Sequence, residues 1–202
     1  MLACVLTMCC RFAAGRSNTG TTRWARSLKL NHHAEPLRAA APSGYRELII
    51  VREGVERPRP MVDPDGNRVS LVPPGHDGIS QLAIVMAVRS LSEHRSFYGD
   101  ILGFAEQPWS GGLAFRLGDS LLLLEEDPAT TVDPVRQAPG WRYITLQVSD
   151  IDTVHSDLRS NGVCEGLAPV TLGSVARISM ILDPDGNWIE LSRRASIVGS
   201  LS

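Results

Sequence analysis

Glu190 is the residue of this sequence with the clearest capacity for chemistry. It stands in the run Trp188-Ile-Glu190-Leu, which is predicted to form a strand, so Trp188 and Glu190 share one face. A carboxylate on a buried, mostly apolar face can act as a general base or accept a hydrogen bond from a ligand. The structural alternative is that Arg177 or Tyr143 satisfies the carboxylate across the sheet, because buried carboxylates are normally paired. Both interpretations remain open from the sequence.

The histidines are weaker candidates for a ligand or a base than Glu190. His94 and His155 fall within predicted helices, where we expect them on solvated faces. His76 falls in a predicted loop and is the only histidine kept as a candidate ligand or base. His32 and His33 belong to the N-terminal segment.

Two helices are predicted to support the strands. Ser90 and Glu93 have capping-box spacing, and an apolar stripe from Leu91 to Leu102 ends at Gly103. The second helix is capped by Asp150 and closed by Asn161-Gly162. Its apolar stripe is Ile151, Val154 and Leu158. Each helix follows an apolar strand, predicted over 81–88 and 143–148.

A repeated motif gives the domain plan. Asp-Pro-Asp-Gly-Asn occurs at 63–67 and again at 183–187, and Leu117-Gly118-Asp119 is a weaker copy midway between them. The period is therefore about 60 residues. The Asp-Gly and Gly-Asn pairs supply the positive φ angles of tight turns rather than calcium ligands, since an EF-hand needs alternating oxygen ligands and a terminal Glu.

These signals divide the chain into five parts. Residues 1–42 are expected to be a disordered basic leader or a misassigned N-terminus, and residues 43–75 the C-terminal half of a preceding module, called here the half-module. The first module is predicted at 79–126, the second module at 141–194, and a tail at 195–202. Because a half-module exposes sheet edges, we expect it to pack on the main domain, to dimerise or to be poorly ordered.

The runs Phe97-Tyr-Gly-Asp-Ile-Leu-Gly-Phe104 and Asp183-Pro-Asp-Gly-Asn-Trp-Ile-Glu-Leu191 resemble the vicinal oxygen chelate superfamily. It includes glyoxalase-type lyases and isomerases, extradiol dioxygenases and bleomycin-resistance proteins. The resemblance implies an α+β fold in which tandem βαβββ modules pair into an open, cupped mixed β-barrel. Helices lie outside, a ligand lies within, and here a partial module precedes the pair.

Alternation along the strands of that fold predicts which side chains face the cup. In the second module Ile144, Leu146 and Val148 should face the helix, which leaves Gln147 for the cup. The predicted ligand contacts are Tyr143, Thr145, Gln81, Arg177 and Trp188. In the first module the cup side should include Ala83, Val85, Ala87, Leu122 and Leu124.

Members of this superfamily that are enzymes usually hold one divalent metal with His or Glu. The matching positions here are Ala83, Leu122, Tyr143 and Glu190, of which only Glu190 is an ordinary ligand. A catalytic metal usually has about three protein ligands. Two alternatives follow: no metal, or Fe, Mn, Zn or Ni held by Glu190 with help from Tyr143, water or the ligand.

Composition excludes some partners. The net charge of −2 comes without a Lys/Arg stripe, and the apolar runs are shorter than the ~20 residues of a membrane-spanning helix. We therefore expect neither nucleic acid nor membrane as partner. The cysteines give no disulfide pattern, which favours the cytoplasm, whereas a basic N-terminus without acidic residues leaves mitochondrial targeting as an alternative.

Three functions remain. The leading hypothesis is binding of a small, partly apolar molecule in the cup, with the metal site largely lost. The second is a metal-dependent glyoxalase-type lyase or isomerase, or an extradiol-type dioxygenase, that uses Glu190. The third is a non-catalytic paralogue that forms a homodimer through the half-module.

Overall fold

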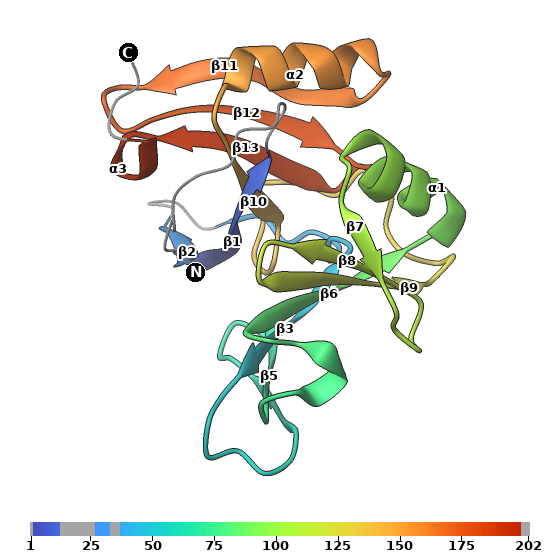
Figure 1. The fold of residues 1–202 in the computed structure, drawn as a ribbon. Coiled ribbons are helices and arrows are strands. Elements are labelled where there is room, and N and C mark those ends of the chain that lie inside the picture. The colour runs from blue at the N-terminus through green and yellow to red at the C-terminus, as the bar shows by residue number, and fades with distance from the viewer. Residues whose placement is uncertain (1, 13–26, 33–36, 199–202) are drawn as a thin grey trace.

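The computed structural model describes residues 2–12, 27–32 and 37–198, which form two mixed sheets with helices against them (Figure 1). The α+β class predicted from the sequence is confirmed. The two sheets are cupped and open, and they do not close into a barrel. No helix in the described ranges is long and apolar enough to cross a membrane.

Sheet A carries the second module. Its strands, in spatial order, are β11 (Cys164–Leu172), β12 (Ala176–Leu182), β13 (Trp188–Arg194), β10 (Tyr143–Val148), β1 (Leu2–Phe12) and β2 (Ser27–His32). The first and last strands of the module, β10 and β13, run parallel and side by side. Helix α2 (Ile151–Ser160) covers one face of β11 to β13, at the top of Figure 1.

Sheet B carries the first module and the half-module. Its strands, in spatial order, are β4 (Arg59–Val62), β5 (Arg68–Val72), β3 (Tyr45–Val51), β6 (Leu82–Val88), β9 (Ser120–Glu126), β8 (Leu113–Leu117) and β7 (Ala105–Gln107). Strands β6 and β9 are parallel, as β10 and β13 are. Helix α1 (Leu91–Arg95) continues as a wider π-helical turn, η2 (Ser96–Ile101), and a short helix α3 (Ala195–Val198) follows β13.

Local sequence explains where the helices begin and end. The Ser90 hydroxyl accepts the backbone N–H of Glu93 at 3.4 Å, and the Asp150 carboxylate accepts that of Thr153 at 3.2 Å. These bonds satisfy N–H groups that the first helical turn leaves without a partner. Gly103, at φ 69°, turns the chain out of the first helix in a conformation that favours glycine.

The half-module packs on the main domain. Strand β3 pairs with β6 in antiparallel fashion and with β5 in parallel fashion, so it extends sheet B (β3 and β5 lie at the bottom of Figure 1). Tyr45 and Leu48 of β3 are buried in the main apolar core. Strand pairing and burial thus place the half-module against the first module, and the homodimer stays a prediction.

The leader expected over residues 1–42 needs a correction. Two of its parts, β1 and β2, are strands that pair with each other, and β1 also pairs with β10. A wholly disordered leader is therefore wrong for these parts. Residues 13–26 and 33–36 lie outside the described ranges, and targeting stays a prediction.

The second Asp-Pro-Asp-Gly-Asn turn docks the second module onto both the half-module and the first module. The Asn187 Oδ1 accepts the Gly44 N–H at 2.7 Å, and the Asp185 carboxylate accepts the Arg89 N–H at 2.7 Å. The Tyr98 hydroxyl donates to Asp183 at 3.4 Å. One copy of the repeated turn has thus become a buried joint between modules.

Candidate functional site

Glu190 lies on the face of sheet A opposite to α2, called here the cup face. Its side chain is buried, and the Thr145 hydroxyl donates a hydrogen bond to it at 3.2 Å from the facing position of β10. Tyr143, Met180 and Trp188 form a small apolar cluster apart from the core beneath α2. A buried carboxylate therefore lies beside aromatic and thioether surface.

Gln147 continues this polar strip. It is 4 % exposed, and neither its amide nitrogen nor its amide oxygen has a hydrogen-bond partner among the residues that the structure describes. Ser192, directly opposite on β13, is fully buried, and its hydroxyl also lacks a partner there. Since unpaired buried polar groups cost free energy, such a strip is typical of a place where a ligand or water binds. The sequence predicted Gln147 for the cup by alternation but gave it no role.

Trp188 forms a wall beside the strip. Its indole N–H donates to the Pro134 carbonyl at 3.0 Å, and the Arg136 guanidinium lies 5.4 Å from the ring centre. A Cβ added at Gly166 would lie 2.6 Å from the ring, so glycine is needed for this packing. The loop between β9 and β10 therefore fixes the indole in place.

Two predicted ligand contacts lie elsewhere. Arg177 donates to Asp152 of α2, with its Nε 2.8 Å from Oδ2, and so points to the helix side of sheet A. It neither pairs with Glu190 nor reaches the cup face. Gln81 is exposed and precedes β6, outside the buried part of that strand. The structure thus brings Glu190, Thr145, Tyr143 and Trp188 together and leaves Arg177 and Gln81 out.

The cup face of β9 was predicted one residue out of register. Leu122 and Leu124 belong to the core under the helices, whereas Leu121 and Leu123 cluster with Ala83 and Val85. Four consecutive leucines contain no alternation, so this run carries no signal for the register of the strand. The position facing Val85 in β6, as Glu190 faces Thr145 in β10, is Leu123 rather than Leu122.

The helical histidines are buried rather than solvated, contrary to expectation. His155 Nε2 lies 2.8 Å from Glu165 of β11. His94 is fully buried, and its Nε2 lies 3.4 Å from Asp183 and 3.6 Å from Asp185. His76 lies at the surface with its Nε2 3.6 Å from Asp77. None of the three is among the cup-face side chains described above.

The buried joint between the modules has perturbed proton affinities. Burial lowers the pKa of His94, but the hydrogen bond and charge of Asp183 outweigh it, so the net pKa is raised. The pKa of Asp185 is raised, chiefly by burial. The pKa of Tyr98 is raised well above its usual value by burial and by the charge of Asp183. These shifts belong to the joint rather than to the cup.

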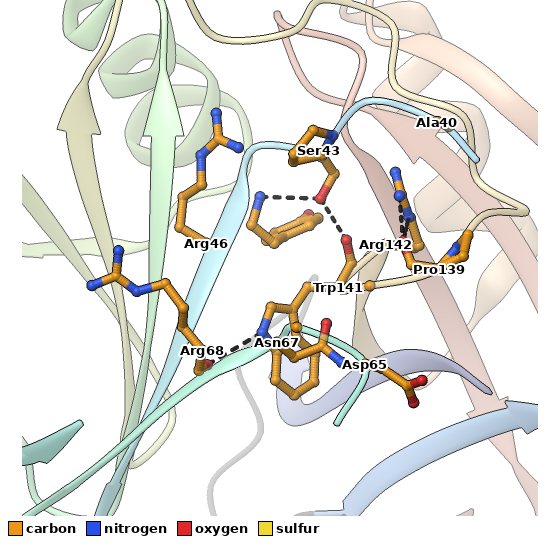
Figure 2. Close-up of a pocket in the computed structure, with 13 residues that line it drawn as sticks. Ala40, Ser43, Arg46, Asp65, Asn67, Arg68, Pro139, Trp141 and Arg142 are labelled. Carbon is orange, nitrogen blue, oxygen red and sulfur yellow. Dashed lines mark hydrogen bonds between the residues drawn. The ribbon is translucent and has the colours of Figure 1, made fainter. Parts of the chain in front are cut away.

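A hollow of about 310 Å³ lies between the half-module and the segment before β10 (Figure 2). Several of its polar groups are already engaged in hydrogen bonds. The Ser43 hydroxyl donates to the Trp141 carbonyl at 2.6 Å, and the Asn67 amide donates to Asp63 at 2.8 Å. The buried Arg142 guanidinium donates to the carbonyls of Ala41, Val135, Ala138 and Pro139. This hollow is a structural junction.

The side chains of the cup do not fit a metal ion of the kind the superfamily uses. With the register corrected, the positions are Ala83, Leu123, Tyr143 and Glu190, which offer a single carboxylate. Across the described residues no three His, Cys, Asp or Glu side chains are grouped to hold a metal ion. The donor set therefore falls short of the usual three protein ligands.

The family model of the Glyoxalase/Bleomycin resistance protein/Dioxygenase superfamily matches residues 79–191. The chain belongs to this superfamily. The match covers more than half of the chain and spans β6 to β13, which includes Glu190 and its neighbours on the cup face. The membership implied by the sequence resemblance is thus confirmed.

Several solved structures are similar to about half of the chain. A glyoxalase/dioxygenase from Nostoc punctiforme is 23% identical with a TM-score of 0.47, covering 55% of this chain and 88% of its own. Virulence protein STM3117 from Salmonella typhimurium is 26% identical with a TM-score of 0.44, covering 55% and 92%. Lactoylglutathione lyase from Agrobacterium tumefaciens is 17% identical with a TM-score of 0.44, covering 55% and 90%. Comparison with curated proteins gave no match.

Proposed function

We propose that this superfamily member binds a small, partly apolar molecule on the cup face of sheet A without a resident metal. The observation that carries the proposal is Gln147, whose buried amide has no partner among the described residues. An amide offers one donor and one acceptor side, so it can hold a ligand group that presents both. Tyr143 and Trp188 supply the apolar surface that orients such a ligand.

Glu190 has a positioning role in this proposal. The Thr145 hydroxyl donates to one of its oxygens, which restrains the carboxylate next to Thr145. Ser192 extends the strip next to Gln147. Four neighbouring polar side chains on β10 and β13 would then form hydrogen bonds with the polar part of the ligand.

The first test combines metal analysis with ligand screening. Purified protein is expected to contain far less than one equivalent of Fe, Mn, Zn or Ni. Benzamide, nicotinamide and catechol serve as probes, observed through the Gln147 side-chain amide and Trp188 indole signals in ¹H–¹⁵N spectra. We expect at least one probe to shift both signals, and Gln147→Leu to abolish the response while Gln137→Leu, on the exposed loop, retains it. Stoichiometric metal that is lost in Glu190→Ala, or silence from all probes, would overturn the proposal.

A second candidate is an enzyme of the glyoxalase or extradiol-dioxygenase type. It is favoured by one observation, the buried Glu190 carboxylate on the cup face. The test is turnover of the methylglyoxal–glutathione adduct and of catechol with added Fe(II), Ni(II) or Zn(II). Turnover that depends on metal and on Glu190 would support this candidate, and no turnover with any combination would remove it.

A further inference from the structure

The half-module builds a second hollow, separate from the strip around Glu190. The hollow has a volume of about 450 Å³ and is lined mainly by β3, β6 and β9, with Trp109, Arg68 of β5, Asp77 and Asp127 completing it. In the register of sheet B, Glu47 faces Val85, and Val85 faces Leu123 on its other side. The two halves of the hollow therefore come from the half-module and from the cup face of the first module.

The floor of this hollow is apolar. Val85, Leu123 and Ala87 are all buried, and Ile49 and Trp109 pack on the cluster to which Val85 and Leu123 belong. The Trp109 ring lies close over the Gly111 backbone, where an added Cβ would come within 2.5 Å of it. An aromatic wall thus stands in a fixed orientation beside an aliphatic floor.

The rim of the hollow is acidic. Its lining contains two arginines and five carboxylates, which amounts to a net charge of −3. Both arginines are engaged: Arg68 lies 3.4 Å from Glu47, and Arg46 donates to Thr130 at 2.6 Å. Glu125 faces Ala87 across the sheet and forms no hydrogen bond or ion pair with the residues that the structure describes. A negative charge at the end of an apolar floor is thus left uncompensated.

We infer that this hollow is a second binding site, for a small aromatic cation such as a protonated arylmethylamine. The floor of Val85, Ala87 and Leu123 accepts the ring, and Trp109 offers an indole face that attracts a cation. Glu125 receives the ammonium group, because it is the carboxylate next to the floor without another partner. The inference does not depend on the ligand of the strip around Glu190.

The test compares three probes that share one ring system: 1-naphthylmethylamine, 1-naphthylmethanol and 1-naphthoate. Binding to the full chain is measured by calorimetry, and the Trp109 indole signal locates it. The amine should bind more tightly than the alcohol, and the carboxylate should bind weakest. For an exposed charge pair we expect Glu125→Gln to weaken amine binding by about 2- to 5-fold, and rising salt to reduce the difference.

Two controls separate this site from the other one. Glu53→Gln removes an exposed carboxylate outside the hollow and should leave amine binding unchanged. Gln147→Leu should also leave it unchanged, so failure at the strip and failure at this hollow can be told apart. Ala87→Leu, which narrows the floor, should weaken both the amine and the alcohol. Equal affinity for amine and alcohol, or an unaltered Trp109 signal at saturation, would overturn the inference.

Discussion

The imidazole Nε2 of His94 lies 3.4 Å from the carboxylate of Asp183, and both side chains are fully buried. His94 comes from the first helix of the first module and Asp183 from the turn before the last strand of the second. The other ring nitrogen, Nδ1, lies 2.9 Å from the Ser90 carbonyl, which can accept its proton. A titratable pair therefore joins the two modules, together with Asp185 and the Tyr98 hydroxyl.

This pair predicts that stability falls as pH rises above neutrality. Because folding raises the pKa of His94 above its ordinary value of 6.5, its contribution is complete below that pH and is lost as pH rises through the folded pKa. The raised pKa of Asp185 has the same sign but its own pH range, since its contribution is complete below its ordinary value of 3.8 and is lost as pH rises through its folded pKa. We therefore expect the free energy of unfolding to fall measurably as pH rises from 6.5 through the folded pKa of His94.

Urea unfolding at several pH values checks the predicted fall of stability with rising pH. His94→Gln should lower stability at pH below 6.5 and remove most of the slope above it. His76→Gln, at the surface, should leave the slope unchanged. A wild-type slope of the opposite sign would contradict the assignment of a charged His94.

The two copies of the Asp-Pro-Asp-Gly-Asn turn should contribute differently to the free energy of unfolding. Asn187 is fully buried, and its loss leaves the Gly44 N–H without a partner and removes the side-chain amide that donates to the Asp183 carboxylate. Asn67 donates a hydrogen bond within its own turn, to Asp63, and makes no comparable bond to another module among the residues that the structure describes. We expect Asn187→Ala to lower the free energy of unfolding by about 2–4 kcal/mol and Asn67→Ala by about 1 kcal/mol. Chemical denaturation of the two variants measures the difference, and equal losses would refute a joint built on the second copy.

The sequence was sufficient to predict those structural features that have a strong local pattern. Capping residues located both helices, and alternation in Tyr143-Ile-Thr-Leu-Gln-Val placed Tyr143, Thr145 and Gln147 on one face. The repeated turn revealed the modular plan. These features depend on neighbours in sequence, which is why they could be predicted.

Features that depend on contacts between distant parts of the chain could not be predicted from the sequence in the same way. The all-leucine run of β9 carries no register, so the cup-facing leucines were misassigned. Arg177 could pair with an acid on either side of sheet A, and only the packing of α2 brings Asp152 within 2.8 Å. The burial of His94 depends on how the second module docks, which no local pattern records.

Removing the unpartnered amide at Gln147 should stabilise the protein while abolishing ligand binding. Leucine has a similar volume and no polar atoms, so Gln147→Leu avoids the desolvation cost of a buried unpaired amide. We expect a gain of about 1–2 kcal/mol in the free energy of unfolding. Gln137→Leu, at an exposed position, should change it by less than about 0.5 kcal/mol. A large loss of stability in Gln147→Leu would show that the amide has a structural partner.

Arg142 and Arg177 should contribute very differently to the stability of the protein. Arg142 is buried, and its guanidinium donates to backbone carbonyls on both the segment before β3 and the loop before β10. Truncation leaves these carbonyls unsatisfied, so Arg142→Ala should cost about 3 kcal/mol or more. Arg177 forms a solvated pair with Asp152, so Arg177→Ala should cost less than about 1 kcal/mol and leave probe binding at the cup face unchanged. Denaturation curves and the benzamide titration of both variants decide the matter, and lost binding in Arg177→Ala would return that residue to the site.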